Sequence, residues 1–206
     1  HTFICPSEFS RGKYIQCKIP EQKIKVKPNF VEDPGENKEK KEYAIFIGRL
    51  SIEKGIQTLL KSIANNPTIP LLIIGSGPLA EDIKKASDKF ENVRFLGRLG
   101  HDHTLGVLRK ARFLVYPTLC YETFGRVIVE AYSCGVPVIT SRIGALEELV
   151  HDGVTGLFTN PKDVEDLSNK MRWLWEHPEV SVQMGKNARN EYFRRFTPEI
   201  NYQSLI

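Results

Sequence analysis

Residues 43–64 read YAIFIGRLSIEKGIQTLLKSIA, which is a short apolar run, a glycine-containing turn and then a helical pattern. The run 43–47 is almost entirely apolar or aromatic and has the length of a buried strand. In residues 56–64, apolar side chains recur at the spacing that places them on one face of a helix. A strand joined directly to a helix is the repeating unit of a parallel α/β sheet.

The same alternation of strand and helix continues along the chain. Further strand candidates are 71–74, 93–96, 113–116 and 136–140, and further helix candidates are 79–90, 126–133, 163–176 and 179–196. We therefore predict an α/β fold with a doubly wound, mainly parallel sheet of Rossmann-like type. Ligands bind such sheets beyond the carboxyl ends of the strands. A site is therefore expected in the loops at Gly48-Arg49, Gly75–Pro78, Gly97-Arg98 and Tyr116–Gly125.

The chain is predicted to hold one main domain. Residues 1–40 read as a lead-in or interdomain segment, with a helical stretch at 8–17 and a short run at 23–27. Residues 32–41 are polar and contain Pro34-Gly35, so we place a loop and the boundary there. The α/β domain then spans 41–206. Its last helix is expected to be truncated at Ile206, and the chain to be an excised piece of a longer protein.

The composition excludes several classes of protein. Of the 206 residues, 41% are hydrophobic and 26% are charged, and the net charge is +4. Lys and Arg do not form a stripe with interleaved aromatic residues, so no nucleic-acid partner is expected. No apolar run approaches the roughly 20 residues that span a bilayer, so no transmembrane segment is expected. Cys5, Cys17, Cys120 and Cys134 follow no disulfide or zinc pattern, which favours a reducing, cytoplasmic compartment.

Two cations follow the first strand of the main domain. Gly48-Arg49 comes directly after the strand, and Lys54-Gly55 comes directly before the next helix. A guanidinium offers several planar donors and an ammonium offers a compact charge, so the two together suit a pyrophosphate and can stabilise a leaving nucleoside diphosphate. Taken alone, such a pair is more often ordinary surface charge.

The segment 75–80, GSGPLA, fits the permissive G-x-G-x-x-A form of the dinucleotide fingerprint. That fingerprint needs an acidic residue about 20 positions later to hold the ribose. The next strand instead ends at Leu96-Gly97-Arg98, and the GSGPLA loop follows the second strand rather than the first. We therefore disfavour a nicotinamide cofactor and interpret Gly75 and Gly77 as a tight backbone turn that approaches some other ligand.

The strongest pattern is residues 117–131, PTLCYETFGRVIVEA, which places Glu122 in a loop and Glu130 in the following helix. Gly125 lets the backbone approach a ligand, and the start of the helix offers N–H groups to phosphate oxygens. Carboxylates accept hydrogen bonds from paired sugar hydroxyls. The alternative is that Glu130 is a solvated or salt-bridged helix residue and Glu122 is an ordinary loop charge.

Other conspicuous residues are interpreted as structural. Trp173 and Trp175 are expected to pack in the core or against another domain. His101 and His103 are placed in a polar loop that lacks a convincing third ligand, so no metal site is expected. Cys120 has no local histidine to activate it and is expected to be a small wall residue of the site.

The ordered set of motifs resembles the C-terminal, donor-binding domain of retaining GT-B glycosyltransferases, the large family-4 or group 1 class. The resemblance covers nearly everything from Ile4 to Ile206. The matching pieces, in order, are PSEFS (6–10), KPNF (27–30), GRL (48–50) with Lys54-Gly55, GSGP (75–78), FLG (95–97), the glutamate motif, GVPV (135–138), GALE (144–147) and GVTG (153–156). One such motif is weak evidence, but the ordered set is specific.

The resemblance implies a site for a UDP-, GDP- or ADP-sugar. Arg49 and Lys54 would neutralise the diphosphate, Glu130 would hold the ribose and Glu122 would lie against the donor sugar. Arg49, Lys54 and Glu122 are therefore the catalytic candidates. The other donor-binding candidates implied by the resemblance are Gly48, Gly75, Gly77, Gly97, Thr123, Phe124, Gly125 and Val127, with the backbone of 123–125 meeting the sugar or its phosphate.

Two positions depart from the family pattern, and both leave the donor preference open. Thr123 stands where members often have Gly, and Arg126 stands where an aliphatic residue is common. We expect Arg126 to point to solvent, with a phosphate contact as the alternative.

The resemblance further implies a retaining hexosyltransferase-type enzyme that transfers a sugar to a hydroxyl acceptor in polysaccharide or glycolipid assembly, with no metal or other cofactor. Acceptor recognition would come from an N-terminal domain outside this chain, so the chain alone is expected to bind nucleotide but to transfer negligibly. The expected location is cytoplasmic. Peripheral contact of the full-length protein with a membrane is left open. The alternatives are another GT-B enzyme, such as an epimerase or phosphorylase, a non-catalytic binding module and, last, a dehydrogenase domain.

Overall fold

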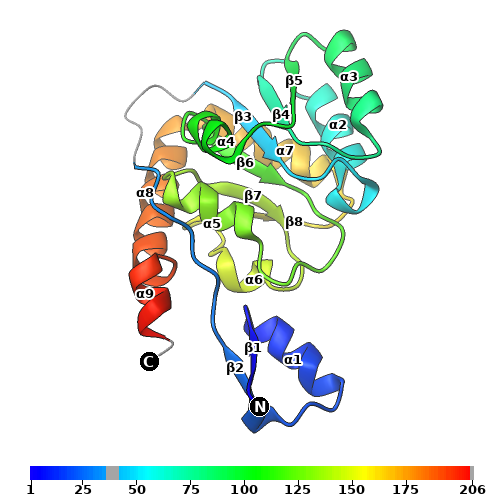
Figure 1. The fold of residues 1–206 in the computed structure, drawn as a ribbon. Helices are drawn as coiled ribbons and strands as arrows, with labels where there is room; N and C mark the ends of the chain where they lie inside the picture. Colours follow the sequence, from blue (N-terminus) through cyan, green and yellow to red (C-terminus); the bar gives the residue numbers. More distant parts are fainter. Residues whose placement is uncertain (36–41, 205–206) are drawn as a thin grey trace.

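A computed structural model describes residues 1–35 and 42–204 and confirms the predicted α/β fold (Figure 1). Its centre is a six-stranded sheet in which every pairing is parallel, with the strand order β5-β4-β3-β6-β7-β8. The strands are β3 (Ala44–Ile47), β4 (Leu71–Ile74), β5 (Val93–Gly97), β6 (Phe113–Tyr116), β7 (Val138–Ser141) and β8 (Gly156–Thr159).

This strand order makes the sheet doubly wound. The chain builds outward from β3 through β4 to β5, and then returns to place β6 on the other side of β3. The loops that leave β3 and β6 therefore run in opposite directions and open a crevice at the carboxyl ends of these two strands. In register, Ala44 of β3 is paired with Leu71 of β4 and with Phe113 of β6.

Helices cover both faces of the sheet, so its central strands are buried on both sides, as their continuous apolar runs predict. In β3 and β6, Ile45, Phe46, Phe113 and Leu114 are completely buried. Helix α2 packs against α7 on one face, and α5 packs against α8 on the other (Figure 1). The helices of this domain are α2 (Ile56–Ala64), α3 (Ala80–Lys89), α4 (His101–Leu108), α5 (Arg126–Ser133), α6 (Leu146–Leu149), α7 (Val164–Glu176), α8 (Pro178–Arg195) and α9 (Pro198–Gln203).

The prediction was wrong about residues 101–103. His101 and His103 lie in the first turn of α4, not in a loop. The segment has a glycine in its middle and no side-chain cap at its start, so its local pattern is weak. Burial of Leu105 and Leu108 supplies the stability that the local sequence lacks. The short α6 was also not predicted, and β7 begins two residues later than expected.

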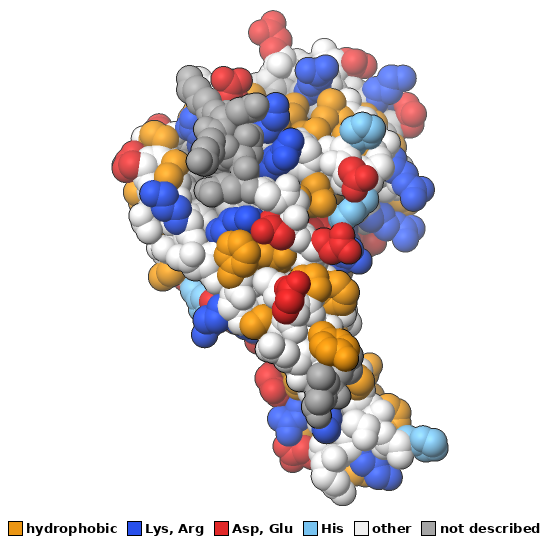
Figure 2. Space-filling model, turned by 60° about the vertical axis from the view of Figure 1, so that its left-hand side comes forward, with side chains coloured by type: hydrophobic (Ala, Val, Ile, Leu, Met, Phe, Trp, Pro, Cys, Tyr) orange, Lys and Arg blue, Asp and Glu red, His pale blue; other side chains and the backbone are white. Residues whose placement is uncertain are grey.

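Residues 1–26 form a small lobe below the main body (Figures 1 and 2). Strands β1 (Phe3–Cys5) and β2 (Ile24–Val26) pair in parallel, joined by α1 (Glu8–Gln16) and a 3-10 turn (Glu21–Lys23). Ser7 caps α1 by accepting from the Ser10 amide. The predicted boundary loop at 32–41, with its lysine-rich run 38–41, lies largely outside the described residues. Within the described part of the chain, no helix is long and apolar enough to cross a membrane.

Candidate functional site

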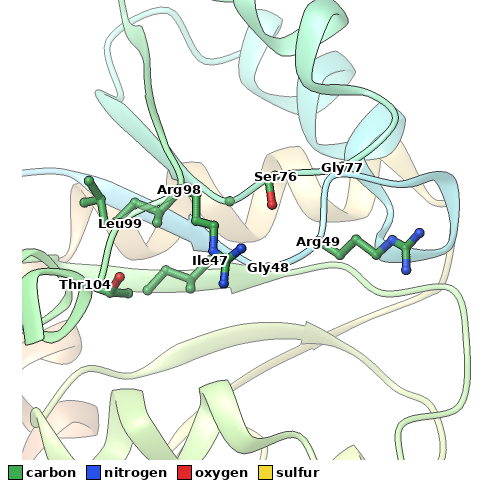
Figure 3. Close-up of a pocket in the computed structure, with 10 residues that line it drawn as sticks. Ile47, Gly48, Arg49, Ser76, Gly77, Arg98, Leu99 and Thr104 are labelled. Carbon is green, nitrogen blue, oxygen red and sulfur yellow. The ribbon is translucent and has the colours of Figure 1, made fainter. Parts of the chain in front are cut away.

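A pocket of about 530 Å³ opens at the carboxyl ends of β3, β4 and β5 (Figure 3). It brings together four of the predicted residues, Gly48, Arg49, Gly75 and Gly77. Ser76 and Arg98 also line the pocket and belong to loops in which the site was expected, although neither was named as a site residue. The other lining residues are Ile47, Ile74, Leu99 and Thr104. Gly97 does not line this pocket, but its carbonyl accepts from the Gly75 amide (2.9 Å) and so holds the same turn.

The two glycines of the 75–77 turn are needed because the backbone of the first loop passes directly against them. A Cβ on Gly75 would lie 1.9 Å from the Gly48 carbonyl oxygen, and one on Gly77 would lie 2.5 Å from the Leu50 carbonyl oxygen. Hydrogen bonds join the same two loops, from the Leu50 amide to the Ser76 carbonyl (3.0 Å) and from the Leu79 amide to the Leu50 carbonyl (2.9 Å). The tight backbone turn predicted from GSGPLA therefore forms one wall of the pocket.

Two guanidinium groups flank the pocket. Figure 3 shows Arg98 extending from the loop after β5 across the pocket towards Gly48, while Arg49 extends away from Gly48 on the other side. Both side chains are exposed, and neither makes a hydrogen bond or ion pair with another described residue. Two cations that form no ion pair with a described residue suit an anionic ligand with more than one phosphate. The Gly97-Arg98 loop was expected to hold part of the site, but Arg98 was not named as a site residue, because only its position after the strand end pointed to it.

Lys54 and Glu122 form an ion pair beside the hydroxyl of Tyr116. Lys54 Nζ donates to Glu122 Oε1 and to Tyr116 Oη (3.1 Å), and Tyr116 Oη donates to the same Glu122 oxygen (2.8 Å). Lys54 ends the 3-10 turn Ile52–Lys54 after β3, Tyr116 ends β6, and Glu122 lies in the loop that follows. Two of the three catalytic candidates, Lys54 and Glu122, therefore meet at the switch point between β3 and β6.

The ion pair is well shielded from solvent, since the side chains of Lys54 and Glu122 are only 18% and 17% exposed. Water therefore screens their attraction less than it screens a surface pair. Burial and the adjacent Glu122 carboxylate raise the pKa of Tyr116 well above its usual value. The phenol is thus a permanent hydrogen-bond donor to Glu122 across the physiological pH range.

Glu130 lies in α5 and is largely buried, with 12% of its side chain exposed. It pairs with Arg126, whose Nε lies 3.1 Å from Glu130 Oε1. Arg126 is 63% exposed, so it points to solvent as expected while it also makes this pair. Burial raises the pKa of Glu130, and the charges of Arg126 and His101 offset part of that rise. Both the predicted ribose contact and the alternative salt bridge are compatible with this geometry.

In the loop 121–125, Tyr121 and Thr123 are exposed, whereas Phe124 and Gly125 are buried. The Phe124 ring is buried, 5.9 Å from the Phe196 ring, and Val127 packs against the core. The Thr123 carbonyl accepts hydrogen bonds from Ser7 Oγ (2.7 Å) and Ser10 Oγ (3.1 Å) of the small lobe. The small lobe therefore holds the loop that carries Glu122, a contact that the sequence did not predict.

The small lobe is also held by the end of α6. The Glu148 carboxylate accepts from the amides of Glu8, at 2.9 Å, and of Phe9 at the start of α1. A carboxylate at a helix N-terminus satisfies unpaired N–H groups and complements the helix dipole. The Phe9 ring lies 5.0 Å from that of Tyr121, the neighbour of Glu122. The small lobe thus contacts both α6 and the loop that carries Glu122.

Replacing Glu130 by glutamine is expected to stabilise the protein at neutral pH while weakening nucleotide binding. Because folding raises the pKa of Glu130, its contribution to stability is complete below its unfolded pKa and is lost as the pH rises through its folded pKa. Glutamine has no charge to bury, so its advantage should be present at pH 7.5 and vanish near pH 4. Urea unfolding at the two pH values measures this.

Glu91→Gln is the matched control for Glu130→Gln. Glu91 is exposed between α3 and β5, so its replacement removes the same charge without relieving burial. An equal stabilisation by both variants at pH 7.5 would show that net charge, not burial of Glu130, is responsible.

Comparison with known proteins shows the family to which this chain belongs. The profile of the family described as "Glycosyl transferases group 1" matches residues 29–191. D-rhamnosyltransferase WbpZ of Pseudomonas aeruginosa is 34% identical over 159 residues, which cover 75% of this chain and 42% of that protein. Sulfoquinovosyl transferase SQD2 of Arabidopsis thaliana is 36% identical over 155 residues, which cover 73% of this chain and 30% of that protein.

Among solved structures, HepE of Anabaena in complex with UDP superposes with a TM-score of 0.89 at 24% identity, over 99% of this chain and 62% of that one. At this identity the likeness shows the shared fold. The chain spans less than half the length of the two relatives aligned by sequence. The family profile covers more than half of the chain and contains the pocket, the Lys54–Glu122 pair and Glu130. The chain therefore belongs to the group 1 glycosyl transferases.

Proposed function

We propose that this chain is the donor-binding half of a retaining glycosyltransferase, which binds a nucleotide-diphosphate-sugar and transfers its sugar to a hydroxyl acceptor. The observation that carries the proposal is the pocket at the carboxyl ends of β3, β4 and β5, with Arg49 and Arg98 beside it. Its volume of about 530 Å³ lies within the roughly 300–1,000 Å³ typical of small-molecule sites. The pocket is proposed to take the nucleotide.

The diphosphate is proposed to lie between Arg49 and Lys54, which follow β3. These cations stabilise the negative charge that develops on the leaving nucleoside diphosphate, without a metal ion. Glu130 is proposed to accept from the ribose hydroxyls, and Glu122 to accept from a hydroxyl of the donor sugar. Retention is proposed to follow from a same-face reaction in which the leaving phosphate assists the incoming acceptor hydroxyl.

The loop after β5 disfavours NAD as the ligand. A domain that binds NAD places an acidic residue after this strand to accept from the ribose. Here β5 is followed by Arg98, a donor with no acceptor capacity, and its side chain lines the pocket. HepE, which shares the fold, was solved with UDP.

The acceptor is proposed to be recognised by a second, N-terminal domain in contact with the small lobe. Phe3 and Ile4 of β1 are 43% and 56% exposed, and Tyr14 and Ile15 of α1 are 37% and 38% exposed. These side chains give the lobe an apolar surface that an additional domain would cover. The whole protein is proposed to be cytoplasmic, with peripheral membrane contact where the acceptor is a lipid, and to act in polysaccharide or glycolipid assembly.

Calorimetric titration with UDP, GDP, ADP and NAD tests the proposed function. We expect one nucleoside diphosphate to bind, NAD not to bind, and Arg49→Ala to lower the affinity about tenfold or more, since a hydrogen bond to a charged group is lost. Glu130→Ala should weaken the same ligand. Arg94→Ala, which removes an exposed guanidinium from β5, is the control and should bind normally.

Two outcomes of this titration would overturn the proposal: binding of NAD alone, or no binding of any nucleoside diphosphate. Addition of EDTA tests the metal-free part separately, because an obligatory metal would make the affinity collapse when it is chelated. In the longer protein, the anomeric configuration of the product distinguishes retention from inversion.

A further inference from the structure

Tyr116 occupies an unusual place, because its ring belongs to the core while its hydroxyl belongs to the site. It is only 5% exposed, and its ring stacks on that of Phe46 with the centroids 6.5 Å apart. Its carbonyl accepts from Thr140 Oγ1 of β7 (2.8 Å). The ring is therefore fixed by the sheet, so the position of the hydroxyl is set by the fold rather than by the loop that carries Glu122.

The hydrogen bonds that join Lys54, Tyr116 and Glu122 can all be made at once. Tyr116 Oη has one proton, which it donates to Glu122 Oε1, and it accepts from Lys54 with a lone pair. The Lys54 ammonium has three protons, of which Glu122 and Tyr116 use two. One proton therefore remains for a phosphate oxygen, and a diphosphate can bind Lys54 without breaking the cluster.

The two oxygens of Glu122 are used differently. Oε1 accepts from Lys54 and Tyr116, and Thr118 Oγ1 (3.3 Å) and Cys120 Sγ (3.9 Å) also approach it. Oε2 makes no hydrogen bond with any residue that the structure describes. The carboxylate is thus anchored through one oxygen, which leaves the other to accept from a ligand.

We propose that Tyr116 is a positioning residue of the donor site: its hydroxyl bridges Lys54 and Glu122 and fixes the carboxylate so that Oε2 accepts from a hydroxyl of the donor sugar. This inference rests on the proposed function. Tyr116 touches neither phosphate nor sugar, and it acts through the two side chains that do. The predicted consequence is a loss confined to the sugar-bearing ligand.

Ligands that differ by one group at a time distinguish a positioning role of Tyr116 from a purely structural role. UMP, UDP and UDP-glucose are titrated into the wild-type protein and into Tyr116→Phe. Two parallel series use GMP, GDP and GDP-mannose, and AMP, ADP and ADP-glucose. In the series that the wild-type protein binds, we expect Tyr116→Phe to lower the ratio of nucleotide-sugar to diphosphate affinity about tenfold, as for loss of a hydrogen bond to a charged group. Monophosphate affinity should be unchanged.

Tyr192→Phe is the matched control, because Tyr192 is also fully buried and its hydroxyl donates to the Val31 carbonyl (2.9 Å), outside the cluster. It should leave the ratio unchanged. Thr118→Val removes a hydroxyl that lies 3.3 Å from the same Glu122 oxygen and shares its one proton with the Glu53 carbonyl (3.1 Å), so it should lower the ratio in the same direction by less. It also keeps the test open if Tyr116→Phe does not fold.

The outcomes of these titrations are distinct. If Tyr116→Phe and Thr118→Val weaken all members of a series equally, or leave the ratio unchanged, the positioning role is refuted while the donor site stands. If the wild-type protein binds none of the diphosphates, the proposed function fails and this inference fails with it.

Discussion

Nucleoside diphosphate binding by Lys54→Ala is expected to be about 100-fold weaker than that of the wild-type protein, since a charge-assisted hydrogen bond is lost and a carboxylate is left uncompensated. In the wild-type protein, Lys54 neutralises Glu122 within a shielded ion pair. Without the ammonium, the negative charge of Glu122 faces a ligand that is itself negative. Calorimetric titration with the preferred diphosphate measures the loss.

A double-mutant cycle separates the two contributions. Lys54→Ala/Glu122→Gln lacks both charges, so it should recover about tenfold of the affinity lost in Lys54→Ala, as expected for side chains in direct contact. Glu122→Gln alone should leave diphosphate binding nearly unchanged and weaken only the nucleotide-sugar. Lys61→Ala removes an exposed ammonium from α2 and is the control for net charge. Additive losses across the cycle would show that Lys54 and Glu122 act independently.

Replacing Gly55 by alanine is expected to lower the free energy of unfolding by about 3 kcal/mol or more, through strain in a left-handed backbone and a steric clash. Gly55 has φ +72° between the turn that carries Lys54 and helix α2. A Cβ there would lie 1.8 Å from the carbonyl oxygen of Pro117, the residue after Tyr116. Relief of the clash requires β6 and the Lys54 turn to separate, so diphosphate affinity should fall as well.

Gly106→Ala is the control for Gly55→Ala, and its effect should have the opposite sign. Gly106 lies within α4, and a Cβ there would meet nothing within 4 Å. Alanine in a helix is more stable than glycine by roughly 0.5–1 kcal/mol. Urea unfolding measures both variants. A Gly55→Ala variant within 1 kcal/mol of the wild-type protein would show that this backbone adapts and that the close approach to Pro117 is not essential.

Local patterns were sufficient to predict the fold class and most of its elements. Strands buried on both faces appear as continuous apolar runs, and helices appear as apolar side chains three and four positions apart. Helix α7 begins where the pattern predicts, since Asp163 caps it by accepting from the Asp166 amide. The parallel sheet follows because each strand is followed by a helix that returns the chain to the same end of the sheet.

The same patterns could not predict α4 or the role of Arg98. Helix α4 is stabilised by burial of Leu105 and Leu108 rather than by its own propensity. Arg98 was noted only as part of a loop in which a site was expected, and whether its side chain enters the pocket depends on how the loop after β5 packs on β4. These are consequences of packing, which has no short-range signature in the sequence.

The candidate site also has a part that could be predicted from local sequence and a part that could not. Arg49, Lys54 and the glycines at 75 and 77 could be chosen from the sequence because they lie in loops that follow predicted strands. Glu122 and Glu130 were chosen from the pattern of residues 117–131 and from the family resemblance. The pairing of Lys54 with Glu122 across 68 positions, the Tyr116 hydroxyl between them, and the Ser7 bond to the Thr123 carbonyl across 116 positions could not be predicted in this way. Such contacts depend on the strand order, which places β6 beside β3, and strand order is set by the packing of the whole chain rather than by any local run of residues.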